Sequence, residues 1–297
     1  MPLAWVLRRL TLSRMASDLP LPGAGMLKQA IIGRVRAVFN DGARGEKPVM
    51  RSDRALFARD SVIWRVHGDV TTMLVGGVTS LLLQMLHPSV LAGVWDHSNF
   101  RQDMLGRLRR TARFIALTTY GDRDEAMALI ARIRGIHDHI SGRLPDGGAY
   151  SATDPRLLAW VHVTEATSFL DAWIRYSEPR MSIADQDRYF AEIGEIARAL
   201  GAAPVPATRA EANELIRSFR PELAATARSA EVARILLRQR ATHIAVAPVQ
   251  AVTFQAAIDL LPAWAQRMHG LFPAPLSVPL VRGGALGLAR TLRWAFR

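Results

Sequence analysis

The stretch RLRRTARFIALTTYGDRDEAMALIARIRGIHDHISG, residues 107–142, carries two helical patterns separated by a break at Tyr120-Gly121-Asp122. In the first pattern one helix face collects cationic, hydroxyl and apolar groups: Arg107, Arg110, Thr111, Phe114 and Thr118. In the second pattern one stripe is almost wholly aliphatic: Ala126, Leu129, Ile130, Ile133, His137 and Ile140. The stretch therefore predicts two successive amphipathic helices, the second closed by Gly142.

The second stripe contains a single imidazole, that of His137, whereas His139 falls with Arg132 and Arg143 on the polar side. Together the two helices could form a haem pocket. They could equally form an ordinary core, with a hydrogen-bonded histidine beside a solvated arginine face. These residues alone favour the second interpretation, because most buried polar side chains are structural and satisfied.

The rest of the chain is also helical in pattern. Residues 70–86 are apolar and uncharged, and we interpret them as the central buried helix of a large bundle, ended by His87-Pro88. The pair Gly76-Gly77 would let a neighbouring helix or a flat ligand come close to that backbone. Further helices are expected over the ranges 155–176, 182–200, 209–219, 221–239, 248–260 and 262–269. No run alternates with period two, so the predicted fold is all-α, a single large helical bundle.

We divide the chain into a basic lead-in (1–50), a helical catalytic domain (51–270) and a basic tail (271–297). Cysteine is absent, which excludes disulfides, thiolate haem ligation and covalent haem attachment. The net charge is +12, but the arginines are spread along the chain and no nucleic-acid-binding motif is present, so no nucleic-acid partner is expected. We expect a cytoplasmic protein. Its basic termini are either short amphipathic helices at an anionic membrane surface or frayed tails.

Several site classes are excluded by missing motifs, among them the P-loop, the dinucleotide fingerprint and the zinc-protease helix. A b-type haem needs less: one neutral imidazole, an apolar slot and cations for its propionates. His137, with Arg107 and Arg110, could supply these groups.

A series of short motifs carries a more specific signal. They are LLQMLHP (82–88), GVWDHS (93–98), RLRRT (107–111), HDHISG (137–142) and Asp154-Pro155 with WVH (160–162). In this order they resemble the MpaB-like oxygenase family, which shares its catalytic domain with the latex-clearing rubber oxygenases. The resemblance covers roughly residues 50–270.

The resemblance implies an all-helical fold around a non-covalent haem b, and its better-characterised members cleave carbon–carbon double bonds of polyisoprenoids with dioxygen. His137 matches the proximal iron ligand, and Arg107 and Thr111 match a pair in the haem pocket. His97 and His162, which lie within the motifs, are further candidates for cofactor contacts.

Two departures concern the catalytic groups. Arg110 stands where rubber oxygenases have a distal lysine, and a guanidinium is a poor iron ligand, so the distal side should be open or water-bound. The acidic proton acceptor has no clear match, and Asp96 is a candidate by neighbourhood only. We therefore expect a haem b-dependent oxygenase acting on a hydrophobic isoprenoid or other alkene. The alternative is a haem-binding sensor or carrier without turnover.

Overall fold

The computed structural model describes residues 24–39, 48–241, 244–273 and 277–296, and nearly all of its regular structure is helical. The first helices are α2 (Ala24–Phe39), α3 (Val62–His67), α4 (Val70–Gln84), α5 (Pro88–His97), α6 (Met104–Tyr120) and α7 (Arg123–His137). They are followed by α8 (Pro155–Tyr176), α9 (Ile183–Leu200), α10 (Arg209–Phe219), α11 (Ala227–Leu237), α12 (Ala247–Leu260), α13 (Ala263–His269) and α14 (Val278–Phe296). Short 3₁₀ turns cover Arg220–Glu222 and Ile244–Val246. The prediction of an all-α fold is confirmed.

The helix starts are set by short polar side chains. Asp154 accepts the backbone N–H of Arg156 at 2.8 Å, and Ser182 accepts that of Asp185 at 3.1 Å, so α8 and α9 begin where the sequence predicts. At the end of α9, Gly201 takes the left-handed conformation with φ 98°. The start predicted for the helix over residues 221–239 is wrong. A capping box at Thr226 starts α11 at residue 227.

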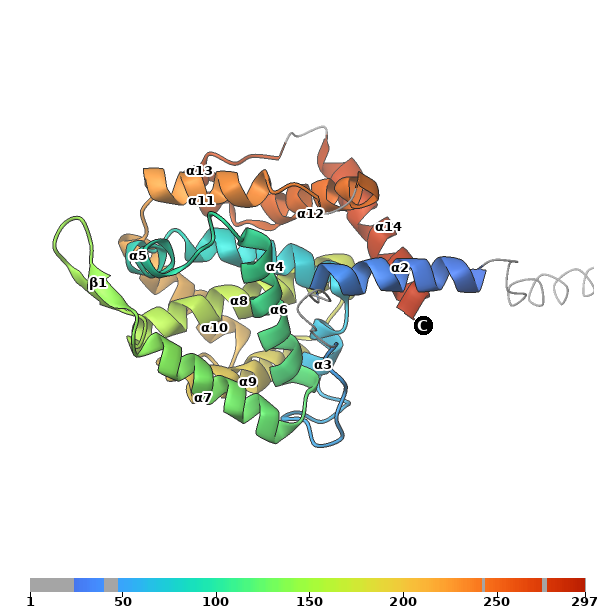
Figure 1. Ribbon diagram of the computed structural model, residues 1–297, viewed down its shortest axis with the longest axis horizontal. Coiled ribbons are helices and arrows are strands. Elements are labelled where there is room, and N and C mark those ends of the chain that lie inside the picture. The colour runs from blue at the N-terminus through green and yellow to red at the C-terminus, as the bar shows by residue number, and fades with distance from the viewer. Residues whose placement is uncertain (1–23, 40–47, 242–243, 274–276, 297) are drawn as a thin grey trace, which may run out of the picture.

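The core of the bundle is the pair α4 and α8, which lie side by side at the centre of the molecule (Figure 1). Most of α4 is buried, as predicted from its uncharged sequence. Gly76 makes the close approach to α8 possible, because a Cβ there would lie 2.7 Å from Cδ1 of Phe169 and 2.9 Å from the carbonyl oxygen of Ser168. The prediction that Gly76-Gly77 admits a neighbouring helix is thus confirmed for Gly76.

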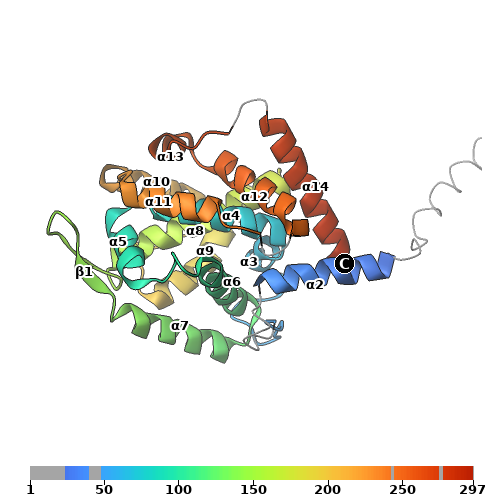
Figure 2. The ribbon, with the colours of Figure 1, turned by 45° about the horizontal axis from the view of Figure 1, so that its top comes forward.

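The other helices cover this pair on opposite sides. Helices α11, α12 and α13 lie above it in Figure 1, and α7 and α9 lie below it. Helices α2 and α14 contact one another at one end of the molecule, as Figure 2 also shows. Two clusters of buried apolar residues fill the space, one around α8, α9 and α10 and the other around α4, α11 and α12.

The tail predicted over residues 271–297 contains α14, which packs on α12, α4 and α2. Arg293 of this helix lies 2.6 Å from Asp69, and Arg282 lies 2.8 Å from Asp259, so both arginines tie α14 to the body. Most of the basic N-terminal segment lies outside the described residues. Within the described ranges no single helix is long and apolar enough to cross a membrane. Helices α4 and α5 would qualify only as a pair, and they are bent by 104°.

A small hairpin at the other end was not predicted. Strands β1 (Ser141–Arg143) and β2 (Ala149–Ser151) pair antiparallel, with Gly142 opposite Tyr150. The prediction that the helix of His137 continues to Gly142 is therefore wrong: α7 ends at His137. The turn at 144–148 folds residues 149–151 back onto residues 141–143. The backbone groups of residues 141–143 therefore form hydrogen bonds between strands and not within a helix.

Candidate functional site

A cavity of about 280 Å³ opens beside the hairpin, between α4, α5, α6, α7 and α8. Its volume is close to the lower end of the range for small-molecule sites in proteins. Its lining is mostly apolar with a few polar side chains: Gln84, Ser89, Val90, Gly93, Val94, His97, Ser98, Arg107, His137, Ile140, Tyr150, Ser151, Ala152, Leu157, Leu158 and Val161. Six separate segments of the chain, the five helices and β2 of the hairpin, therefore meet around one hollow.

Helix α6 borders this hollow without closing it. Of its residues only Met104, Thr118 and Thr119 are buried. Phe114 and Ile115 remain half-buried on its inner side. Both side chains pack against the core cluster around α8 and α9, and neither lines the cavity.

His137, the last residue of α7, lines the cavity. Its Nδ1 atom is buried and has no hydrogen-bond partner among the residues that the structure describes. Burial lowers the pKa of His137, while the neighbouring Asp138 carboxylate acts in the opposite direction. A neutral imidazole with an unpartnered buried nitrogen is the state in which histidine binds a metal. By contrast, His139 is exposed, and its Nδ1–H donates to the carbonyl of Gly135 at 2.7 Å.

Arg107 brings a cation to the same cavity from the first turn of α6. Its Nη1 donates to Oγ of Ser98 at 3.1 Å, and within the described part of the chain it makes no ion pair. Burial, with the nearby charge of Arg110, lowers the pKa of Arg107 to about 10. The guanidinium is therefore still charged at neutral pH, and it could pair with a carboxylate ligand.

A hydrogen-bonded group at the cavity wall joins α5 to the hairpin. The Tyr150 hydroxyl donates to Oδ2 of Asp96 at 2.8 Å, and Nε2 of His97 lies 3.3 Å from that hydroxyl. His97 Nε2 also lies 3.2 Å from the carbonyl oxygen of Ser141. Asp96 itself does not line the cavity, whereas Tyr150 and His97 do. Sequence reasoning missed Tyr150; the only available signal was its place between the Pro-Asp-Gly-Gly turn and Asp154.

Three other predicted residues lie outside the cavity lining. Arg110 is exposed and is held by Asn99 and Asp103, at 3.3 and 3.6 Å. Thr111 is exposed, and its hydroxyl donates to the carbonyl of Arg107 at 3.3 Å. His162 is buried on α8 with no partner at Nε2, and burial together with Arg198 lowers its pKa to about 4. The structure thus brings His137, Arg107 and His97 together and leaves these three apart.

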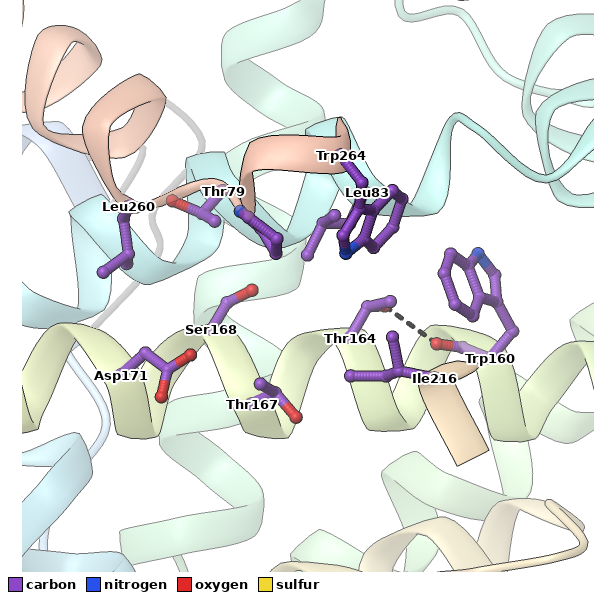
Figure 3. Close-up of a pocket in the computed structure, with 11 residues that line it drawn as sticks. Thr79, Leu83, Trp160, Thr164, Thr167, Ser168, Asp171, Ile216, Leu260 and Trp264 are labelled. Atoms are coloured by element: carbon purple, nitrogen blue, oxygen red, sulfur yellow. Dashed lines mark hydrogen bonds between the residues drawn. The ribbon is translucent and has the colours of Figure 1, made fainter. Parts of the chain in front are cut away.

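A second hollow lies on the other side of α8 and is much smaller, about 20 Å³. In Figure 3, Thr79 and Leu83 of α4 face Thr164 and Ser168 of α8 across it. The hydroxyls of Thr167 and Ser168 have no hydrogen-bond partner. This space suits one ordered water and is too small for a substrate.

The residues of the larger cavity fit the haem that the resemblance implies. Haem iron is held in a macrocycle and needs only one protein side chain, which a neutral His137 can supply. The propionates need cations, and Arg107 is a partly desolvated one with no carboxylate partner among the described residues.

Comparisons with known proteins bear on the family. Neither the curated proteins nor the solved structures gave a match. One family model does match, over residues 64–294, and its description is "ER-bound oxygenase mpaB/B'/Rubber oxygenase, catalytic domain". This range runs from α3 to the last turns of α14 and includes every residue that lines the cavity. The chain therefore belongs to the mpaB/rubber oxygenase catalytic-domain family.

Proposed function

We propose that this protein is a haem b-dependent oxygenase that acts on a hydrophobic substrate, with His137 as the iron ligand. Membership of an oxygenase catalytic-domain family supports the reaction class. The observation that carries the cofactor assignment is the buried, unpartnered Nδ1 of His137 in the cavity wall. Bound haem would supply the redox chemistry with dioxygen.

The chain's own residues have three tasks in this proposal. His137 stays neutral because burial lowers its pKa, so its ring can bind iron without first losing a proton. Arg107, oriented by Ser98, holds a propionate carboxylate at the edge of the macrocycle. The aliphatic side chains of the cavity wall exclude water and accept an apolar substrate such as an isoprenoid or another alkene. They come from α5 and α8: Val90, Val94, Leu157, Leu158 and Val161.

The absorption spectrum of the purified protein, supplied with haem during expression, tests the proposal. We expect a Soret band that shifts on reduction with dithionite and on addition of carbon monoxide. His137→Ala should abolish the band, whereas His139→Ala, which removes an exposed imidazole two residues away, should leave it unchanged. A protein that stays colourless with haem present, or an equal loss in both variants, would count against the assignment.

A haem-binding sensor or carrier is the second candidate. It is favoured by the placement of three candidate site residues, Arg110, Thr111 and Asp96, outside the cavity lining. Both candidates predict the same spectrum. Oxygen consumption by the reduced protein with long-chain alkenes separates them, because a sensor or carrier consumes no oxygen beyond the blank without substrate.

A further inference from the structure

The hairpin β1–β2 forms one wall of the cavity and little else. Ile140, Tyr150, Ser151 and Ala152, at its base, line the cavity. The remainder of the hairpin projects away from the helices, on the left of Figure 1. A displacement of this single element would therefore widen the mouth of the cavity while the helices stay in place.

The hairpin has few attachments to the bundle. Apart from the chain connections at its base, its main packing partner is the C-terminal half of α5. Each strand has only three residues, and an isolated two-stranded hairpin is at best marginally stable in water. Its position therefore depends on a small number of side-chain contacts.

Tyr150 makes the central contact. The residue is 6% exposed, and its ring lies over Gly142 of the opposite strand, where a Cβ would come within 2.6 Å of the hydroxyl oxygen. The hydroxyl reaches across to Asp96 of α5 at 2.8 Å, and His97 adds a bond to the backbone of Ser141. Asp96 is in turn 3.9 Å from Arg228 of α11. Burial and the Asp96 carboxylate raise the pKa of Tyr150 to about 12, so the hydroxyl keeps its proton and remains a donor.

We infer that the hairpin β1–β2 is a gate whose displacement widens the mouth of the cavity for bulky ligands, and that the hydrogen bond from Tyr150 to Asp96 is the latch that holds the gate in its present position. The gate begins at Ser141, four residues after His137, so its position also shapes the side of the cavity next to that imidazole. Tyr150 is a positioning residue: it acts through the hairpin and admits or excludes bulky hydrophobic ligands. The role as an access gate for such ligands rests on the proposed function. The displacement of the hairpin does not depend on that function.

A distance measurement tests the latch. Because the chain has no cysteine, spin labels can be placed at Ala149→Cys on the hairpin and Arg234→Cys on the exposed face of α11 without a background. For the full-length chain that carries only these two labelled cysteines, we expect one narrow distribution of the distance between the labels. Tyr150→Phe keeps the ring but removes the hydroxyl, and it should raise the open population by about tenfold or more, the effect of losing a hydrogen bond to a charged group.

Two controls make the result decisive. Arg143→Gln removes a bond within the hairpin, from Nη1 to the carbonyl of Gly147 at 2.9 Å, and should leave the distances unchanged. Asp96→Ala should open the gate as Tyr150→Phe does, and the double variant should add nothing further, because both changes remove one interaction. An unchanged distribution in Tyr150→Phe, or additive effects of the two changes, would overturn the latch.

Haem uptake tests the gate. The rate of Soret development after mixing haem with the purified protein should rise in Tyr150→Phe by about the same factor as the open population. If the labels show opening but the uptake rate does not change, ligands enter elsewhere and the gate is refuted. A protein that takes up no haem at all would instead refute the proposed function, while the label distances would still decide on the latch.

Discussion

Gly76 of α4 lies against Phe169 of α8 so closely that a Cβ on the glycine would be 2.7 Å from the ring and 2.9 Å from the backbone Cα. The next residue, Gly77, is in a different position: a Cβ there would be 3.8 Å from the same ring, an ordinary contact. Two adjacent glycines in one helix thus have opposite roles. Gly76 sets the separation of α4 and α8, whereas Gly77 leaves room for a methyl group.

We therefore expect opposite effects on stability from the same substitution. Gly76→Ala should lower the free energy of unfolding by about 1–3 kcal/mol, because α8 has to move away from α4. Gly77→Ala should be neutral or raise it by up to about 1 kcal/mol, since alanine is the better helix former. Urea unfolding followed by circular dichroism measures both. If both variants lost the same free energy of unfolding, the contact with Phe169 would not limit how closely α4 and α8 pack.

His67 should make the protein sensitive to acid. Its ring is buried between the Thr119 hydroxyl at 2.8 Å and the Tyr189 hydroxyl at 3.0 Å, and burial lowers its pKa to about 3. Below pH 6.5 the unfolded chain binds a proton that the folded chain refuses. The stabilisation is therefore complete above pH 6.5 and is lost as the pH falls toward 3, at up to about 1.4 kcal/mol per pH unit.

The matching variant is His67→Gln, which keeps hydrogen-bonding groups but does not titrate. We expect it to be less stable at pH 7 and to have a shallower decline of the free energy of unfolding between pH 6.5 and 4. His162 contributes in the same direction as His67, whereas Glu165 opposes both over nearly the same pH range, so the prediction concerns the difference between the slopes of the parent and the variant. Urea midpoints across this pH range give the slope, and an unchanged slope would contradict the prediction.

Glu165 should lower the stability of the protein as the pH rises, the opposite of the effect of His67. Burial raises the pKa of this α8 carboxyl from its ordinary value of 4.5 to about 7. Between these two values the folded protein holds a proton that the unfolded chain has released, so stability falls as the pH rises through this window. Glu165→Gln, a neutral isostere, should be more stable than the parent at pH 8 by at most about 3 kcal/mol and nearly equal to it at pH 4. Glu195→Gln, on the exposed face of α9, serves as the control, and its free energy of unfolding should differ from that of the parent by less than about 0.5 kcal/mol.

Helical periodicity was sufficient to predict most of the fold and one part of the site. The stripe from Ala126 to Ile140 is buried or half-buried as predicted, and the choice of His137 over His139 agrees with their placement in the cavity wall and in solvent. Periodicity assigns each residue to a helix face. It could separate these two histidines because they lie on different faces of the same pattern.

Periodicity could not determine how closely each helix packs on its neighbours. Arg107, Arg110 and Thr111 share one face of α6, but α6 contributes only Arg107 to the cavity, and Arg110 turns to Asn99 and Asp103. Tyr150 was missed for a different reason. A strand of three residues is too short to show an alternating pattern, and its partner Asp96 is 54 residues away in the sequence.

The two arginines of α6 give a matched pair for the cofactor site. Arg107 is half-buried in the cavity wall, and among the described residues its Nη1 has the Ser98 hydroxyl as its partner. Arg110, one turn away, is exposed and paired with Asp103. If a propionate pairs with Arg107, Arg107→Gln should weaken haem retention by about tenfold, since a charge-assisted bond of about 1.5–3 kcal/mol is lost. Arg110→Gln should change retention by less than about twofold, because an exposed ion pair contributes little. Transfer of haem to an excess of apomyoglobin measures both rates. Equal rates for the two variants would place the propionates away from Arg107, even if His137 holds the iron.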